Sequence, residues 1–305
     1  MSDLEFTTNK SGDESRVTLW FQYSLLSETE IGNYEVFKEI IQTMLIDMRT
    51  MNDGPEMLIS GEFLFEGHLI YKFSVDANDD LSIQLHPNDA LAKERHNSFG
   101  KTEMWYVVDA DKQSKLYVGF DKEYTKDQYL SKFNNGEILE MVNAVEVEKG
   151  AVFFIETGTV HAIGKGVLIA EIQQTSDLTY RIFDWNRTDD NGVSRELHTD
   201  LALEAFDFSK TQIENISYQN KSNQTEKLVS CPYFTTNKLN VEGSFKKDLS
   251  KIDSFVVYMC VEGSGEIAIG ENKEQFRKGE TILIPAIVDA IEIKGEAELL
   301  EVYIE

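Results

Sequence analysis

The sequence predicts a mainly β protein with a few inserted helices, arranged as two successive β-rich regions. Between residues 81 and 184, short runs of β-branched and aromatic residues are bounded by Asp, Gly or Lys, as strands usually are. A second set of such runs begins at about residue 227. In the first region Leu81, Ile83 and Leu85 alternate with polar residues, and this two-residue period indicates a strand with one apolar face.

The chain before residue 81 is predicted to contain a helix and strands. Apolar residues recur at spacings of three and four over residues 33–50, which indicates a helix with one buried face. Alternating apolar runs predict strands over residues 57–76. Residues 1–15 are polar, and we expect them to be frayed.

The first β region also contains helical insertions and is followed by a linker. Thr125–Phe133 and Thr199–Phe206 have helical patterns, and the second is expected to be a short capped helix. Residues 209–226 are rich in Asn, Ser, Gln and Lys and are the best candidate for the linker. The β-rich runs of this region are Val107–Val108, Leu116–Val118, Ala151–Ile155 and Val167–Ala170.

The second β region is predicted from the runs Phe255–Val261, Gly265–Ile269 and Thr281–Pro285. Gly263–Gly265 is predicted to be a hairpin turn and not a dinucleotide-binding loop, because no crossover helix follows it. No histidine occurs after His198. We therefore expect this region to be structural or to mediate dimerisation.

The composition excludes several classes of partner. The chain carries a formal net charge of −25, so it repels nucleic acid and anionic membranes, and we expect neither as a partner. No apolar run approaches the length of a membrane span, and the acidic start Met1–Phe6 is unlike a signal peptide. We therefore expect a cytoplasmic monomer or homodimer in which Cys231 and Cys260 are reduced.

Four polar side chains have the chemistry of metal ligands. Gln84 and His86 share one face of the strand predicted around residues 81–86, and Glu103 and His161 follow later in the chain. Two imidazoles, a carboxylate and an amide oxygen suit one Zn²⁺ with positions left open for substrate. Taken singly, each has a simpler interpretation, such as a strand end or a core histidine with its hydrogen bonds satisfied. An inward polar row is costly unless something binds it.

Four segments of the chain, in order, resemble the type I mannose-6-phosphate isomerase (phosphomannose isomerase) family in its short bacterial form. They are Asp76–Asp89, Gly100–Ala110, Gly158–Gly166 and Glu171–Arg187. A looser similarity continues to the C-terminus. The resemblance implies a double cupin of RmlC-like jelly rolls and a metal-dependent enzyme. It also implies a sugar phosphate as the small-molecule partner, with mannose 6-phosphate and fructose 6-phosphate interconverted through an enediol.

The resemblance also implies the domain boundaries. Residues 76–208 are expected to form the metal-binding catalytic cupin, and residues 227–305 a degenerate C-terminal cupin. Residues 209–226 connect them. Residues 1–75 form a divergent N-terminal segment, whose helix is expected to pack on the first roll.

Catalytic roles follow from the same resemblance. Arg181 matches an essential arginine of the family and would clamp the phosphate or the enediolate, with Asp177 orienting it. Lys101 lies two residues before Glu103, so we expect it on the same face, beside the metal, whose positive charge can lower the pKa of Lys101 and leave it usable as a base or a charge clamp. Glu171 is a second candidate base. In a chain this acidic, a phosphate pocket needs local cations, and the candidates are Lys101, Lys165 and Arg181.

The sequence departs from the family pattern near its start, and this keeps alternatives open. No Gly-Gly follows Trp20, where the family has Trp-Gly-Gly, and Glu156–Thr157 replaces a proline. The alternative function is a catalytically weakened paralogue that binds a sugar or sugar phosphate and keeps its metal. Another metal-dependent cupin, such as a dioxygenase, is disfavoured by the carboxylate and amide in the ligand set and by Lys101.

Overall fold

The computed structural model describes residues 4–7, 16–19, 70–76, 79–174, 176–188, 191–209, 215–284, 286 and 288–304. The helix predicted over residues 33–50 lies outside them, and so does most of the strand prediction for residues 57–76. The described part of the latter is strand β3, Ile70–Asp76. Residues 4–7, predicted to be frayed, instead form β1 (Leu4–Thr7), which pairs with β2 (Arg16–Leu19).

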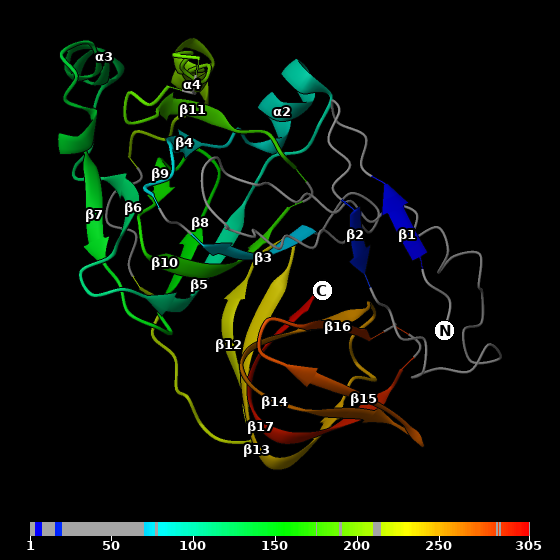
Figure 1. Ribbon diagram of the computed structural model, residues 1–305. Helices are drawn as coiled ribbons and strands as arrows, with labels where there is room; N and C mark the ends of the chain where they lie inside the picture. Colours follow the sequence, from blue (N-terminus) through cyan, green and yellow to red (C-terminus); the bar gives the residue numbers. More distant parts are fainter. Residues whose placement is uncertain are drawn as a thin grey trace.

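The first roll consists of two antiparallel sheets, with strand orders β3-β10-β5-β8 and β11-β4-β9-β6-β7 (Figure 1). The four strand runs predicted for this region are confirmed and lie in β5, β6, β8 and β10. The strands are β4 (Ile83–Leu85), β5 (Glu103–Ala110), β6 (Lys115–Phe120), β7 (Val142–Glu146), β8 (Val152–Ile155), β9 (His161–Ile163), β10 (Val167–Gln173) and β11 (Tyr180–Phe183).

Apolar side chains from both sheets fill the interior of the first roll. On β5 the inward positions are Glu103, Trp105 and Val107, because alternate residues of a strand face the same side. Trp105 and Val107 belong to the buried cluster, which Leu116 of β6 and Ile169 of β10 complete from both sheets. Glu103, the first residue of β5, is thus an ionisable side chain on the face that is otherwise apolar. It lies at one end of the roll.

Three α-helices lie among the described residues. α3 (Lys126–Asn134) confirms the predicted insertion and begins with a capping box between Thr125 and Gln128. α4 (Thr199–Ala205) is also where the sequence predicts it, but the side chain of its N-cap residue His198 makes no cap hydrogen bond. α2 (Asp89–His96) was not predicted, although Asn88 caps it by accepting a hydrogen bond from the backbone N–H of Leu91. A short 3₁₀ turn, η2, spans Ile138–Glu140.

The second roll is a six-stranded antiparallel sheet that curls around its own core (Figure 1). Its core includes Leu239, Tyr258, Ile267, Phe276 and Leu299. It consists of β12 (Thr225–Ser230), β13 (Thr235–Asp248), β14 (Val256–Ile269), β15 (Asn272–Arg277), β16 (Thr281–Ile284) and β17 (Ala290–Tyr303).

The hairpin turn predicted at Gly263–Gly265 is wrong, because these residues lie inside the continuous strand β14. Gly263 has a φ of 79°, and a Cβ added there would lie 2.0 Å from the carbonyl oxygen of Glu296 in β17. Glycine is therefore required here because two backbones approach closely at a bulge. In the sequence, glycines at such a position have the same appearance as glycines of a hairpin turn.

The two rolls share one buried interface. The outward residues of β5 and β10, such as Met104 and Ile172, pack against Val257 and Met259 of β14 and Leu300 of β17. The described part of the predicted linker also joins the first roll, since the backbone N–H at position 216 donates to the backbone carbonyl of residue 152. The second roll therefore supports the sheet that carries the polar end of the first.

No helix among the described residues is long and apolar enough to cross a membrane. The expectations of a cytoplasmic location and of a monomer or homodimer stay predictions.

Candidate metal centre

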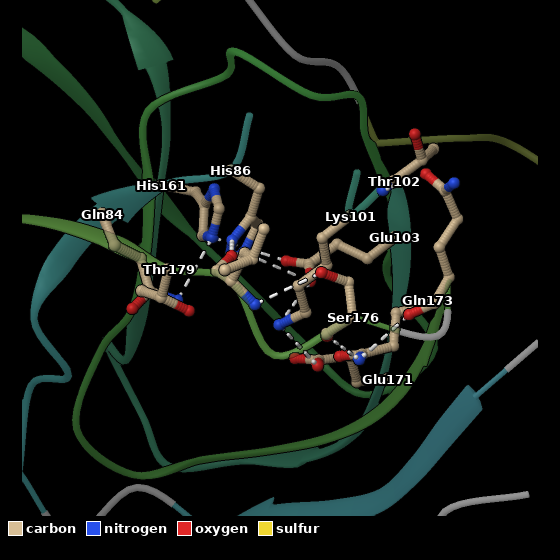
Figure 2. Close-up of polar contacts among 12 residues, drawn as sticks. Gln84, His86, Lys101, Thr102, Glu103, His161, Glu171, Gln173, Ser176 and Thr179 are labelled. Carbon is tan, nitrogen blue, oxygen red and sulfur yellow. Dashed lines mark hydrogen bonds and ion pairs between the residues drawn. The ribbon is translucent and has the colours of Figure 1, made fainter. Parts of the chain in front are cut away.

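Three buried side chains converge at one end of the first roll, from strands that are far apart in the sequence. His86 follows β4 directly, Glu103 is the first residue of β5, and His161 is the first residue of β9. Each is 1% exposed. One nitrogen of each imidazole and one carboxylate oxygen lie within 4.8 Å of one another, so the three can share one ion (Figure 2).

Backbone carbonyls fix the orientation of both imidazoles. Nδ1 of His86 lies 2.6 Å from the carbonyl oxygen of Leu178. Nδ1 of His161 lies 2.9 Å from that of Thr159. A carbonyl only accepts hydrogen bonds, so each Nδ1 carries a proton, and Nε2 of the neutral ring keeps its lone pair. The Nε2 atoms approach Glu103 to 3.6 and 3.4 Å, an orientation that suits metal-ligating histidines.

The chemistry of the donor set fits a divalent cation. Burial lowers the pKa of His161 from 6.5 to about 4, the positive charge of Lys101 adds to this, and the hydrogen bond to Thr159 opposes it. His161 is therefore neutral at pH 7, which is the state in which an imidazole binds a metal. Imidazole nitrogens with a carboxylate oxygen form a common donor set for Zn²⁺.

Gln84 lies beside this group, opposite His161 in the pairing of β4 with β9. Its Nε2 is 3.4 Å from Nε2 of His161, while its Oε1 accepts a hydrogen bond of 3.4 Å from Ser82 Oγ. The amide thus presents its nitrogen to the centre. A half-turn of the amide group would present the oxygen instead, which is the atom that a ligand role needs.

Lys101 and Glu171 extend the buried cluster, as Figure 2 shows. Nζ of Lys101 lies 3.3 Å from Oε2 of Glu103 and 3.5 Å from Oε1 of Glu171. Burial alone would lower the pKa of Lys101, but the charges and hydrogen bonds of the two carboxylates outweigh it and raise the pKa. The lowered pKa was expected from the charge of a bound metal ion, so that expectation stays a prediction.

Arg181 also lies next to the cluster, on the edge strand β11. It is the direct cross-strand partner of Gln84 in β4, so the two side chains share a face. Its Nε donates to Ser82 Oγ at 3.4 Å, and its NH1 donates to the carbonyl oxygen of Glu196 at 3.0 Å. A guanidinium group is thus held beside the candidate ligands.

Two residues named from the sequence lie elsewhere. Asp177 is exposed, and the contacts that orient Arg181 come instead from Ser82 and Glu196. Lys165, expected among the cations of a phosphate pocket, has a side chain that is 69% exposed and lies 3.7 Å from Asp79. It belongs to the turn between β9 and β10.

Sequence reasoning missed Gln173, which is 1% exposed and pairs with Glu103 between β10 and β5. Its Nε2 donates to the carbonyl oxygens of Gln174 and Ser176 at 3.2 and 2.9 Å. Its Oε1 has no hydrogen-bond partner among the described residues, so it can accept one from a bound hydroxyl group. The alternation of Glu171 and Gln173 on one strand was the signal that could have identified it.

Comparison of the sequence with known proteins gives one family. The family described as "Mannose-6-phosphate isomerase, cupin domain" matches residues 204–304, which contain the second roll. Mannose-6-phosphate isomerase ManA of Bacillus subtilis is 35% identical over 229 residues, covering 74% of this chain and 72% of that protein. The mannose-6-phosphate isomerase of Streptococcus mutans is 33% identical over 227 residues, covering 74% and 71%.

Comparison of the fold agrees. The crystal structure of the mannose 6-phosphate isomerase from Bacillus subtilis matches with a TM-score of 0.72 and 29% sequence identity, covering 78% of this chain and 75% of that one. A putative mannosephosphate isomerase from Archaeoglobus fulgidus has a TM-score of 0.63 at 17% identity, which shows likeness of fold only. The predicted fold class, a mainly β cupin, is confirmed.

Proposed function

Because the chain belongs to the mannose-6-phosphate isomerase family, we propose that it interconverts mannose 6-phosphate and fructose 6-phosphate in a metal-dependent reaction. The observation that carries the proposal is the buried group of His86, Glu103 and His161, with an ammonium group and a second carboxylate beside it. The reaction moves a proton between C1 and C2 of the sugar through an enediol. It needs a base and stabilisation of negative charge that develops on oxygen.

The metal is proposed to be one Zn²⁺ per chain, held by Nε2 of His86, Nε2 of His161 and the carboxylate of Glu103. Gln84 would add its amide oxygen after the half-turn described above. When bound, the ion supplies a Lewis acid that stabilises negative charge on the sugar oxygen.

Glu171 is proposed to move the proton, with Lys101 as its partner. The carboxylates of Glu103 and Glu171 raise the pKa of Lys101 and favour its protonated form, in which it can donate hydrogen bonds. Glu171 is only 5% exposed, and its Oε1 lies 3.5 Å from Nζ of Lys101, so it places a carboxylate beside the centre with water largely excluded. In this assignment the Lys101 ammonium group stabilises the negative charge that develops on the sugar oxygen.

Arg181 is proposed to bind the phosphate or the enediolate. The net charge of −25 repels an anionic sugar at long range, so a fixed cation is needed near the centre. The guanidinium fork can form two parallel hydrogen bonds to such oxygens. Gln173 Oε1 is proposed to receive a sugar hydroxyl, since it is a buried acceptor on the same inward face as Glu103.

A coupled assay tests the proposal. Zinc-loaded protein is incubated with mannose 6-phosphate, and fructose 6-phosphate is detected as it forms. Deuterium placed at C2 should also exchange partly with water, since an enediol route releases the proton to a base. Absence of turnover in fully zinc-loaded protein would exclude the isomerase assignment.

A second candidate function is favoured by the sequence before residue 81, where no counterpart of the family's Gly-Gly pair follows Trp20. It is a metal-containing protein that binds a sugar or sugar phosphate without efficient turnover. Binding of fructose 6-phosphate by calorimetry, without turnover, would support this function over the enzyme.

A further inference from the structure

The described residues between β11 and α4, 184–188 and 191–198, return to the end of β11, where His198 lies beside Arg181. Trp185 and Asn186 lie near the start of this segment and have φ values of 54° and 55°, in the left-handed region that bulky residues avoid. Trp185 is held in this conformation by a hydrogen bond of 2.8 Å from its Nε1 to the carbonyl oxygen of Leu81. Strained backbone persists where surrounding contacts fix it, and such positions cluster near functional sites.

A buried carboxylate at the start of this segment binds an arginine near its end. Asp184 is 6% exposed, and its Oδ2 accepts a hydrogen bond of 2.7 Å from Nε of Arg195, while its Oδ1 accepts another from NH2 of Arg195. Two parallel bonds between a guanidinium group and a carboxylate fix orientation as well as distance. Arg187 adds a hydrogen bond of 2.6 Å to Oδ1. Residue 195 is thereby attached to the end of β11.

Fixing Arg195 also fixes the residues that contact Arg181. Glu196 follows directly, and its carbonyl oxygen accepts the hydrogen bond from NH1 of Arg181 at 3.0 Å. Nδ1 of His198 accepts a hydrogen bond of 3.1 Å from the backbone N–H of Arg181, and the backbone N–H of His198 donates to Arg181 O at 2.7 Å. This use of its imidazole explains why His198 does not cap α4.

From this anchorage the Arg181 side chain extends to the candidate metal centre. Both backbone groups of Arg181 bond to His198, so Arg181 and Gln84 form a non-hydrogen-bonded pair, in which side chains lie closest. Ser82 Oγ lies 3.4 Å from Nε of Arg181 and 3.4 Å from Oε1 of Gln84. A continuous chain of contacts therefore leads from Asp184 to the centre.

We propose that Asp184 and Arg195 are positioning residues that hold the Arg181 guanidinium in the orientation in which it binds the substrate. The inference rests on the proposed function, since it requires Arg181 to contact an anionic group of the sugar phosphate. A guanidinium group that is held in advance loses less conformational freedom when it binds an anion. Loss of the contact between Asp184 and Arg195 should therefore act through Arg181.

A double-mutant cycle tests this. The wild type, Arg195→Met, Arg181→Lys and the double variant are compared by kcat/KM for mannose 6-phosphate. Arg195→Met should lower kcat/KM about tenfold, mainly by raising KM, and less than about twofold once Arg181 is already lysine. Arg195→Lys should restore part of the loss, because one of the two hydrogen bonds can form.

A matched control separates positioning from general stability. Arg277→Met makes the same change at an exposed arginine of the second roll, which pairs with Glu280, and should leave kcat/KM unchanged. The melting temperature of every variant is measured alongside. If Arg195→Met fails to fold, Asp184→Asn tests the same contact with a side chain of nearly equal size.

Two outcomes of the kinetic cycle overturn the inference. One is an unchanged kcat/KM in folded Arg195→Met. The other is the same fold-loss whether or not the Arg181→Lys change is present, since this would mean that Arg195 acts independently of Arg181. If the wild type binds fructose 6-phosphate without turnover, the proposed reaction fails, and the same cycle on the calorimetric Kd decides the positioning role. Absence of both binding and turnover overturns both proposals.

Discussion

Lys101 and Glu171 form a buried ion pair, with Nζ of the lysine 3.5 Å from Oε1 of the glutamate and each side chain 7% exposed. Their positions differ in one respect that bears on the chemistry. Lys101 also contacts Glu103, at 3.3 Å, so its charge is shared between a candidate metal ligand and Glu171. In such a pair the protonated lysine can stabilise negative charge on oxygen, while the carboxylate transfers the proton.

Glu171→Gln tests this division. Glutamine keeps the size of the side chain and can still contact Lys101, but it cannot take up a proton. We expect kcat to fall about 10²- to 10⁴-fold, with unchanged metal content and a similar affinity for fructose 6-phosphate. Steady-state kinetics and deuterium exchange at C2 measure the effect. Near wild-type turnover would exclude Glu171 as the base.

Replacing the histidines tests the metal site. His86→Ala and His161→Ala should each lose most of the bound zinc, because each removes one of the three donors that converge within 4.8 Å. His96→Ala is the control, since His96 is exposed and contacts Tyr180 instead of the centre. Zinc per chain is measured by elemental analysis after dialysis. Full occupancy in both site variants would contradict the assigned ligands.

Arg181→Lys should keep the fold and the metal but lose activity. A lysine cannot reproduce the planar fork, and loss of one transition-state contact commonly lowers the rate about a hundredfold or more. Kinetics with mannose 6-phosphate measure the loss. Arg277→Lys in the second roll is the matched control and should retain full activity. A similar kcat/KM in both variants would show that Arg181 has only a structural role.

Asp184 gives a prediction about pH. Burial raises its pKa, but the hydrogen bonds and charges of Arg195 and Arg187 outweigh this and lower the pKa below 3.8. A carboxyl group whose folded-state pKa is depressed stabilises the fold above its unfolded-state pKa and loses this effect as pH falls through the folded value. The difference in unfolding free energy between wild type and Asp184→Asn should therefore be constant from pH 7 to 5. Below about pH 4 it should shrink.

Urea unfolding of both proteins at several pH values measures that difference. The comparison between the two proteins cancels the titration of all other groups that they share, provided these groups lie far from residue 184. A difference that grows on acidification would mean that Asp184 has a raised pKa and is not stabilised by Arg195.

Parts of this site could be predicted from the sequence because strand alternation is a local rule. The alternation of Leu81, Ile83 and Leu85 placed Gln84 and His86 on one face, and the structure brings both beside His161. No local pattern could show that Leu178 O and Thr159 O orient the imidazoles, because every residue has a backbone carbonyl and residue type does not reveal which one accepts the hydrogen bond.

The remaining errors arose where distant segments meet. The ion pair of Lys101 with Glu171 was not predicted, because Glu171 comes 70 residues later in the sequence. Gly263 looked like a turn residue because its real constraint, the carbonyl oxygen of Glu296, lies on another strand. Asp177 was expected to orient Arg181, although Ser82 and the backbone carbonyl of Glu196 supply the contacts, from positions 99 and 15 residues away in the sequence.

Removal and return of the metal show whether turnover depends on an ion held by His86, Glu103 and His161. Wild-type protein is assayed with mannose 6-phosphate as loaded with zinc, after exhaustive chelation, and after one equivalent of Zn²⁺ is added back. We expect that chelation abolishes turnover while the fold persists, and that one equivalent restores turnover in the wild type but not in His86→Ala. Full turnover by chelated protein that contains no metal by elemental analysis would contradict it.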